Sequence, residues 1–476
     1  MTTQYAFYFD ATFCSGCKAC QAACKDKNNL PAGVLWRHVI EVAGGTWQKN
    51  GEAWSNTVFA YNLSLSCNHC VYPKCAGVCP TDAYVLRDDG IVFLDTTKCM
   101  GCGYCSWACP YGAPQYNAEA GHMTKCDFCL DNLEKGLPPA CVAACPMRVL
   151  DYEESTVTGP ALALWETPSE DHPYPLPVYS HTQPRLAITP HPAMNTSEKK
   201  SVANLEEIQP SSSSGWEELP LILFTLFVQL AVGSFWAIAW TFPFLWSLVE
   251  YDTTSLRLVP YTLIGASLGA GMLASFAHLG TKKNAWRALS HLRKSWLSLE
   301  ILFTGLFGLG WLFTTLENTI LHHNAFEWTD VTTILGIGLI YSMSQVYRLP
   351  AAPGWNTWRT NAGFMISALL LGQSLMTLLL SYESDLTGIQ LQSSQWVKIG
   401  FGILTLLFVQ LLLMNKHHAH HPWHNVRLGL IIIGIVTLAA TFFLYTSSYT
   451  WISLLVFLMI VLEEGVGRWL FYQSRL

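Results

Sequence analysis

Four runs of cysteines are the strongest chemical signal in this sequence. The first run reads CSGCKACQAAC and holds three cysteines at C-x2-C-x2-C spacing, followed by a fourth after three further residues. Three thiolates at this spacing can occupy three corners of a cubane iron–sulfur cluster, and the fourth then binds a different cluster. The run therefore predicts that another run donates one ligand back. The four runs contain Cys14, Cys17, Cys20 and Cys24; Cys67, Cys70, Cys75 and Cys79; Cys99, Cys102, Cys105 and Cys109; and Cys126, Cys129, Cys141 and Cys145.

These runs use all 16 cysteines of the chain, which matches four [4Fe–4S] clusters at four thiolates each. Zinc ribbons use separated C-x2-C pairs and gain nothing from a third cysteine at the same spacing. Disulfides would suit a secreted domain, but the N-terminus MTTQYAFYFD has neither the basic nor the apolar region of a signal peptide. We therefore expect iron–sulfur clusters.

The composition indicates that the cluster domain is joined to a different kind of structure. Of the 476 residues, 51% are hydrophobic and only 13% are charged, which is typical of a chain that is partly in a membrane. No cysteine follows Cys145, and almost every long apolar run lies after residue 218. The net charge of −6 gives no indication of nucleic-acid binding. Three zones follow: residues 1–150 hold the clusters, 151–215 form an extended tail and linker, and 216–476 form a membrane anchor.

The middle zone is rich in Pro, Ser and Thr, which is typical of extended linkers. Its LPVYS and LAITP segments carry apolar residues that a free linker does not need. We therefore expect part of this tail to pack on the first domain, and we expect SSSSG to be the flexible joint.

Eight apolar stretches of about 20 residues follow, which is the length that crosses a bilayer as a helix. Hardly any charge interrupts them, so buried helices of a soluble protein are a poor alternative. The predicted fold is an α+β ferredoxin-like iron–sulfur domain followed by an all-α membrane bundle of eight transmembrane helices. The stretches are 219–245, 258–279, 296–316, 331–347, 361–381, 395–414, 427–445 and 450–470.

Positive residues in the short loops predict the orientation of this bundle. One side carries 11 Lys and Arg residues, five of them in the loop TKKNAWRALSHLRK, and the other side carries 2. Eight crossings place both ends of the bundle on the basic side. We therefore expect a multi-pass protein of the inner (plasma) membrane whose iron–sulfur domain is on the cytoplasmic face.

Both halves of the chain resemble one family. The cysteine runs, including CNHC-x4-C-x3-CPT and PPACVAACP, resemble the four-cluster electron-transfer subunits of molybdopterin oxidoreductases, and most closely those of the dimethyl sulfoxide reductase family. Residues 216–476 resemble the membrane anchor subunit of the same enzymes in GWEELPLILFTLFVQLAVGSF, ASFAHLG, WRAL and EEGVGRWLFY. The two resemblances cover nearly the whole chain. Two subunits that are usually separate are here one polypeptide.

The resemblance implies how the runs pair, outermost with outermost and inner with inner. It also implies that the fourth cluster is nearest the membrane. In nitrate reductases a tryptophan replaces one ligand of that cluster, and the corresponding Cys102 implies a complete [4Fe–4S] here. The implied ligand sets are Cys14, Cys17, Cys20 and Cys145; Cys24, Cys126, Cys129 and Cys141; Cys67, Cys70, Cys75 and Cys109; and Cys79, Cys99, Cys102 and Cys105.

The histidines disfavour haem. A bis-His haem requires histidines inside facing helices, and only His278 lies within a predicted crossing. The tract HHAHHPWH, residues 417–424, has a metal-binding alternative, but a polar loop is the simpler interpretation. We therefore expect no haem.

A quinol site fits the membrane half better. Quinol oxidation releases two protons with two electrons, so it requires a hydrogen-bonding base beside an apolar slot. His278 ends the second stretch, Glu300 begins the third, and Arg287 lies between them, and ionisable groups at membrane depth are functional candidates. The alternative is that His278 and Glu300 only cap helices in the headgroup zone. The resemblance, in which HLG and the following glutamate belong to the menaquinol site, favours the quinol interpretation. Glu464 and Arg468, one turn apart, are expected to form a structural ion pair.

The resemblance implies an electron-transfer and membrane-anchor component. Menaquinol or another quinol is oxidised in the bundle, and the clusters carry electrons to a separate molybdopterin catalytic subunit. This chain has no pterin-binding domain, so we expect no molybdenum in it. One alternative is reverse flow, from a sulfite-oxidising or similar catalytic subunit into the quinone pool. A second alternative is a redox-linked ion transporter, which needs a continuous chain of ionisable residues across the bundle, and we find none in the middle of the predicted helices.

Overall fold

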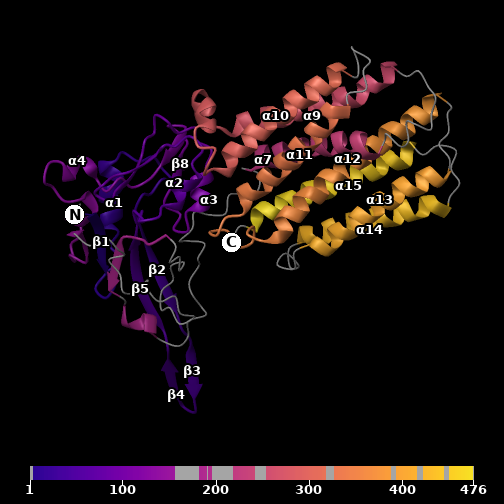
Figure 1. The fold of residues 1–476 in the computed structure, drawn as a ribbon. Coiled ribbons are helices and arrows are strands. Elements are labelled where there is room, and N and C mark those ends of the chain that lie inside the picture. The colour runs from indigo at the N-terminus through magenta and orange to yellow at the C-terminus, as the bar shows by residue number, and fades with distance from the viewer. Residues whose placement is uncertain are drawn as a thin grey trace. The chain divides into compact units, whose positions relative to one another are not determined.

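The computed structural model describes residues 4–155, 182–189, 191–195, 218–241, 254–317, 326–387, 393–414, 422–443 and 450–474. The chain forms two compact units (Figure 1). The first unit comprises Met1–Ser212 and Leu279–Ser295, and the second comprises Ser213–His278 and Trp296–Leu476. The segment Leu279–Ser295, which the sequence predicts to be a loop of the membrane half, thus belongs to the cysteine-rich unit.

The first unit contains a three-stranded sheet with the strand order β10–β1–β11. β1 (Gln4–Asp10) pairs antiparallel with β10 (Leu150–Ser155) and parallel with β11 (Leu186–Thr189). Side chains alternate along β1, so Phe7 is buried and Tyr8 is exposed. β11 is the LAIT part of the tail, which therefore packs on the first unit. The LPVYS and SSSSG segments lie outside the described residues.

Four strand pairs and five short helices complete the α+β architecture of this unit, and each short helix contains a cysteine or directly follows one. The antiparallel pairs are β2 (His38–Gly44) with β5 (Phe59–Leu65), β3 (Trp47–Asn50) with β4 (Ala53–Asn56), β6 (Tyr84–Leu86) with β7 (Val92–Leu94), and β8 (Gln115–Asn117) with β9 (His122–Thr124). The short helices are α1 (Ala19–Lys27), α2 (Lys74–Val78), α3 (Tyr104–Ala108), α4 (Leu130–Leu133) and α5 (Ala140–Ala143). Two 3₁₀ segments, η1 (Pro192–Asn195) and η3 (Lys282–Leu289), also belong to this unit.

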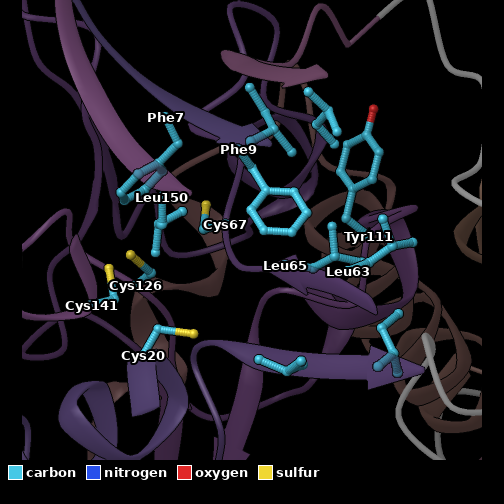
Figure 2. Close-up of a cluster of buried hydrophobic side chains, with 14 of the residues drawn as sticks. Phe7, Phe9, Cys20, Leu63, Leu65, Cys67, Tyr111, Cys126, Cys141 and Leu150 are labelled. Atoms are coloured by element: carbon cyan, nitrogen blue, oxygen red, sulfur yellow. The ribbon is translucent and has the colours of Figure 1, made fainter. Parts of the chain in front are cut away.

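The hydrophobic core of the first unit is shared between strands and cysteines. Phe9 of β1 and Leu63 of β5 have no exposed surface, and the buried thiols of Cys20, Cys126 and Cys141 belong to the same cluster of buried side chains. Figure 2 shows these three cysteines beside the packed aromatic and aliphatic side chains. The cysteines are therefore held by apolar packing and are not on mobile surface loops.

The second unit is helical, and its long helices run side by side (Figure 1). They are rich in Leu, Ile, Phe and Ala, which favours helix formation in an apolar solvent where every backbone group must be paired within its own segment. The helices are α7 (Leu219–Trp236), which continues into the π-helical η2 (Ala237–Thr241), α9 (Thr254–His278), α10 (Trp296–Leu316), α11 (Phe326–Tyr347), α12 (Trp358–Thr387), α13 (Ser393–Leu413), α14 (Pro422–Phe443) and α15 (Thr450–Gln473).

Six helical segments within the described residues are long and apolar enough to cross a membrane. Each of the eight predicted stretches overlaps one of the helices above. The stretches in α11 and α13, however, are not among these six segments. Eight crossings therefore stay a prediction. His424 lies in the first turn of α14 and not in a loop as predicted, because that helix begins earlier than expected; His417 and His418 lie outside the described residues. The six segments are Leu219–Trp240, Leu258–His278, Trp296–Leu316, Trp358–Leu386, Pro422–Ala439 and Thr450–Gln473.

Close packing of small residues joins the helices. α7 packs against α9 and α12, α10 packs against α11, and α12, α13, α14 and α15 form a ring in which each helix contacts the next and α15 contacts α12. Gly233 of α7 faces Gly372 of α12, and a Cβ atom on either would overlap the backbone of the other helix. Such contacts let helix backbones approach closely, as in membrane bundles.

Candidate metal centres and a buried polar site

The C-x2-C turns of the four cysteine runs share one backbone feature. The second residue after the first cysteine has a left-handed φ, which is +68° at Gly16, +41° at His69, +73° at Gly101 and +65° at Phe128. The backbone then folds back over the first thiol, so that the N–H of Gly101 donates to Sγ of Cys99 at 3.4 Å, and the N–H of Phe128 donates to its cysteine at the same distance. Such N–H···S contacts stabilise a thiolate and therefore prepare these turns to bind metal.

Thiols within each set that the family resemblance implies interact electrostatically, and Cys20 with Cys141 and Cys126 with Cys67 also interact between different sets. The four sets therefore stay a prediction. The interactions within the sets are Cys14 with Cys17, Cys20 and Cys145; Cys24 with Cys129 and Cys141, and Cys126 with Cys24 and Cys141; Cys75 with Cys67, Cys70 and Cys109; and Cys105 with Cys79, Cys99 and Cys102.

Two of these sets enclose small cavities. All 16 cysteines lie in described residues and none forms a disulfide. Among the described residues, no three His, Cys, Asp or Glu side chains converge closely enough to hold a single metal ion. The thiols of two implied sets instead line one small cavity each, and four thiolates around one space are what a cubane cluster requires. The lining thiols are Cys14, Cys17, Cys20 and Cys145 in one cavity and Cys67, Cys70, Cys75 and Cys109 in the other.

Burial makes these thiols poor acids in the absence of metal. Desolvation raises the pKa of Cys24 to about 12 and that of Cys102 to about 12. It raises the pKa of Cys109 and of Cys129 to about 11, against backbone hydrogen bonds that lower it. Because a cluster binds thiolates and not thiols, metal must supply the positive charge that keeps these groups deprotonated.

Two buried cations, which sequence analysis did not identify, lie among the thiols. Arg37 is 2% exposed, donates to the hydroxyls of Ser64 and Ser66 at 3.1 and 2.8 Å, and stacks its guanidinium 4.7 Å from the centre of the Phe7 ring. Burial lowers the pKa of Lys125, but the thiols of the surrounding runs raise it by more. Lys125 directly precedes Cys126, and this adjacency was the one available sequence signal. Both cations offset the negative charge of bound thiolates.

The segment Leu279–Ser295 completes the surroundings of the set that contains Cys79 and Cys99. Asn284 Nδ2 donates to the carbonyl oxygen of Cys99 at 2.8 Å and to that of Thr97 at 2.9 Å. His291 donates from Nδ1 to the carbonyl of Cys79 at 2.9 Å, and the Ser295 hydroxyl donates to the carbonyl of Val78 at 2.8 Å. The segment thus fixes the backbone of two different cysteine runs. Sequence analysis named only Arg287 of this segment as a candidate site residue.

The three predicted quinol-site residues fall in two units. His278 is the last residue of α9 and Glu300 lies in the first turns of α10, both in the second unit. Arg287 lies in η3 of the first unit, where its guanidinium is 4.7 Å from the centre of the Trp286 ring.

Glu300 is a buried carboxylate in an apolar bundle. It is 3% exposed, and its Oε1 has no hydrogen-bond partner among the described residues. Tyr347 and Tyr472, whose hydroxyl oxygens are 2.5 Å apart, both interact electrostatically with it. Sequence analysis missed the two tyrosines, because they come from α11 and α15, two helices distant in sequence whose hydroxyls meet only in the folded bundle.

The predicted ion pair between Glu464 and Arg468 is wrong. The structure pairs Arg427 Nε of α14 with Glu463 Oε1 at 2.6 Å instead. Glu464 accepts hydrogen bonds from Ser367 Oγ and Gln410 Nε2, and Arg468 donates from Nη2 to Gln229 at 2.9 Å. The i, i+4 spacing makes a pair on one helix plausible, but in a packed bundle the neighbouring helices offer closer partners.

Comparison with known proteins identifies relatives of both units. Residues 212–473 match the DMSO reductase anchor subunit (DmsC) family, and residues 58–155 match the 4Fe-4S dicluster domain. The sequence is 47% identical over 192 residues to the B component of anaerobic dimethyl sulfoxide reductase from Escherichia coli, a match that covers 40% of this chain and 91% of that protein. It is 36% identical to the formate dehydrogenase iron-sulfur subunit of Wolinella succinogenes, over 30% of this chain and 78% of that protein. It is 41% identical to the B component of tetrathionate reductase from Salmonella typhimurium, over 30% of this chain and 54% of that protein.

Proposed function

Because this polypeptide belongs to the DMSO reductase anchor subunit (DmsC) family and carries a 4Fe-4S dicluster domain as well, we propose that it links a membrane quinol to a catalytic subunit. The chain is an iron–sulfur electron-transfer subunit fused to a multi-pass membrane anchor. In our proposal menaquinol or another quinol is oxidised in the second unit. Electrons then pass through four [4Fe–4S] clusters to a separate subunit.

The buried Glu300 carboxylate carries the quinol part of this proposal. A buried polar atom without a partner is costly, so a position of this kind points to a ligand that completes it. A quinol hydroxyl fits, because it donates a hydrogen bond to the carboxylate and then loses its proton to the same atom. The apolar side chains of the bundle suit the ring and tail of the quinol. His278 and Arg287 are further candidates for quinol binding.

The four thiol sets support the electron-transfer part. We assign one cluster to each set, with the ligands that the family resemblance implies. When bound, these clusters accept and release single electrons. The chain's own residues direct backbone N–H groups at thiols such as Cys99 and Cys126, and place Arg37 and Lys125 where the negative charge collects. These contacts favour the more negative, reduced state of a neighbouring cluster.

The membrane topology extends the same proposal. We propose that all eight helices cross the membrane, α11 and α13 included, and that the basic loops and the cluster domain are on the cytoplasmic face. We propose no haem, because the two histidines in the described crossing segments, His278 and His424, lie at helix ends, whereas a bis-His haem requires histidines inside facing helices.

The catalytic partner is proposed from the relatives. Proteins similar to the first unit are named as subunits of dimethyl sulfoxide reductase, tetrathionate reductase and formate dehydrogenase. We propose that the partner of this chain is likewise a separate molybdopterin subunit. The formate dehydrogenase relative favours one second candidate, in which electrons flow from the partner into the quinone pool. Comparing the midpoint potentials of the clusters with that of the quinone distinguishes the two directions.

Replacing Glu300 tests the quinol site. Glu300→Gln keeps the side-chain volume and removes the base, so the rate of cluster reduction by a menaquinol analogue should fall about 10²–10⁴-fold. Stopped-flow absorbance of the clusters measures this rate, and dithionite should still reduce every cluster. The matched control is Glu317→Gln, which follows α10 at its other end, about 25 Å away. A normal quinol rate in Glu300→Gln means that the site is elsewhere in the bundle.

A further inference from the structure

A cavity of about 870 Å³ lies inside the second unit. Residues of α12, α13, α14 and α15 line it, together with the turn before α12. Arg359, Gly363 and Glu464 are three of these lining residues. These four helices form a ring, so the cavity lies between them. It is at the end where α12 and α14 begin and α13 and α15 end, and it includes Trp358, which is 66% exposed. We name this cavity the vestibule.

The inner end of the vestibule is closed by an apolar layer. Its innermost polar residues are Ser367 of α12, Gln410 of α13 and Glu464 of α15. One turn further, α12 contributes Leu371 and α15 contributes Ile460 to a cluster of buried apolar side chains. A dead end of this kind exchanges water and protons with one side only. It therefore argues against the transporter alternative, which needs polar groups across the whole bundle.

Glu464 is the carboxylate at the floor of the vestibule, and four other helices supply the groups around it. It accepts hydrogen bonds from Ser367 Oγ at 2.7 Å and Gln410 Nε2 at 3.0 Å. Arg427 of α14 is occupied by Glu463, and Arg468 is held by Gln229 Oε1 of α7. Glu464 is 2% exposed in the packed bundle, yet it lines the cavity. It therefore has a fixed position in the wall of the vestibule.

One face of α15 leads from the vestibule to the proposed quinol site. Glu464, Arg468 and Tyr472 stand at positions i, i+4 and i+8, which lie above one another on a helix. Arg468 lines the vestibule, and Tyr472 makes the 2.5 Å contact with Tyr347. Both tyrosines interact with Glu300, and Arg468 interacts with both tyrosines and with Glu464. Glu300, the tyrosine pair and Arg468 are therefore electrostatically coupled, and Arg468 also lines the vestibule.

We propose that the vestibule is the exit for quinol protons, with Glu464 as the carboxylate that receives them. This inference rests on the proposed function, because it needs a quinol oxidised beside Glu300. The Tyr347–Tyr472 hydroxyl pair carries each proton away from Glu300, since each hydroxyl donates and accepts. Arg468 keeps its proton and so does not carry one itself, but it orders the solvent between Tyr472 and Glu464.

The chemistry balances over one quinol. The quinol loses two electrons and two protons and becomes a quinone. The two electrons reduce two clusters by one electron each, and the two protons pass in turn to Glu300, the tyrosine pair, Glu464 and the water of the vestibule. A second proton cannot be accepted until the first has left, so blocking the exit affects turnover and not the first electron transfer.

Glu464→Gln tests this order of events in nanodiscs, with a menaquinol analogue as donor and ferricyanide as the final oxidant. The rate of the first electron transfer from the quinol to the clusters should stay within about twofold of the unmodified protein, while proton release, followed with a pH-indicator dye, and steady turnover should fall at least about 10-fold. Formate, a small weak acid, should restore turnover in Glu464→Gln because the vestibule admits it, and should not restore Glu300→Gln.

A second pair of variants, one that narrows the cavity and one control, leaves every charged residue in place. Gly363 lines the vestibule and a Cβ there meets no atom within 4 Å, so Gly363→Leu fills space in the cavity. Gly429 of α14 is equally open but does not line the vestibule, so Gly429→Leu is its control. Gly363→Leu should slow proton release and turnover, and Gly429→Leu should leave both unchanged.

The outcomes separate the two proposals. Normal proton release and turnover in both Glu464→Gln and Gly363→Leu would overturn the role of the vestibule as a proton exit. The quinol site would still be upheld if Glu300→Gln slows cluster reduction in the first turnover. Normal first-turnover reduction in Glu300→Gln would overturn the quinol site, and the exit with it. Loss of first-turnover reduction in Glu464→Gln means that this residue acts at the quinol itself and overturns its role as an exit.

Discussion

At the scale of single residues, each C-x2-C turn has one position with a left-handed φ. Two of the four runs place glycine there, and two place His69 and Phe128, whose side chains are buried in the core. A left-handed φ costs a residue with a Cβ roughly 1–2 kcal/mol. Burial of the histidine and phenylalanine rings offsets this cost in the other two runs, since burying a large apolar side chain contributes a comparable amount.

Gly101→Ala should damage one cluster and leave the others intact. Alanine at φ +73° is strained, and its Cβ would also lie 2.6 Å from the carbonyl oxygen of Gly121. The N–H contact to Cys99 is then lost, so we expect iron to fall from about 16 to about 12 atoms per chain. Gly103→Ala is the control, because its φ is +75° but no atom lies within 4 Å of the added Cβ. Equal iron loss in both variants would show that strain alone, and not the contact with Gly121, sets the effect.

Cysteine spacing predicted the four local runs, because C-x2-C turns depend on neighbouring residues alone, whereas the pairing of the runs comes from the family resemblance and stays a prediction. Apolar run length likewise predicted the positions of the long helices. Partners of buried ionisable groups were not predictable, as Glu463, Arg427 and Tyr347 show, because they are brought together by helices distant in sequence. His278 and Glu300 could be nominated from position, but the unpaired Oε1 of Glu300 appears only in the packed bundle.

At the scale of elements, Leu279–Ser295 is the most informative segment. It connects two helices of the second unit, yet its hydrogen bonds go to carbonyls of two cysteine runs in the first. Its polar side chains Asn284 and Ser295 are almost fully buried. A loop that served only to reverse the chain would keep such side chains in water, so this segment is part of the wall of the set that includes Cys79 and Cys99.

Asn284→Ala should loosen that set alone. The change removes two hydrogen bonds, each contributing about 1 kcal/mol, and leaves the carbonyl of Cys99 without this donor. One of the reduced-cluster signals in electron paramagnetic resonance should change its g-values or midpoint potential, while the other three stay the same. Lys283→Ala, at an exposed neighbouring position, is the control. If all four signals are unchanged, the segment does not position a cluster.

At the scale of the whole molecule, the fusion fixes the ratio of electron-transfer unit to membrane anchor at one to one. The two parts, which match different families, are joined here by the peptide backbone, and the 4Fe-4S domain is carried wherever the anchor is inserted. A single preparation therefore reports on the cofactor content of both units.

Metal analysis of the anaerobically purified chain tests this view. Four complete clusters predict about 16 iron atoms and as many acid-labile sulfides per polypeptide, with little zinc. Removing iron with a chelator after oxidation should expose the buried thiols and destabilise the first unit, because their clusters replace core contacts, while the helices of the second unit keep their circular dichroism. About four zinc atoms and little iron would contradict the assignment.

The position of Leu279–Ser295 in the sequence also sets an order of synthesis. A ribosome completes residues 1–212 first, but the unit to which they belong lacks a part of its wall until residue 295 has been made. At roughly 5–20 residues per second, the 83 intervening residues take about 4–17 s. During this interval α7 and α9 emerge and the Cys79–Cys99 region stays open. Nascent chains thus have a period in which iron and sulfide can be delivered before the last segment covers the site.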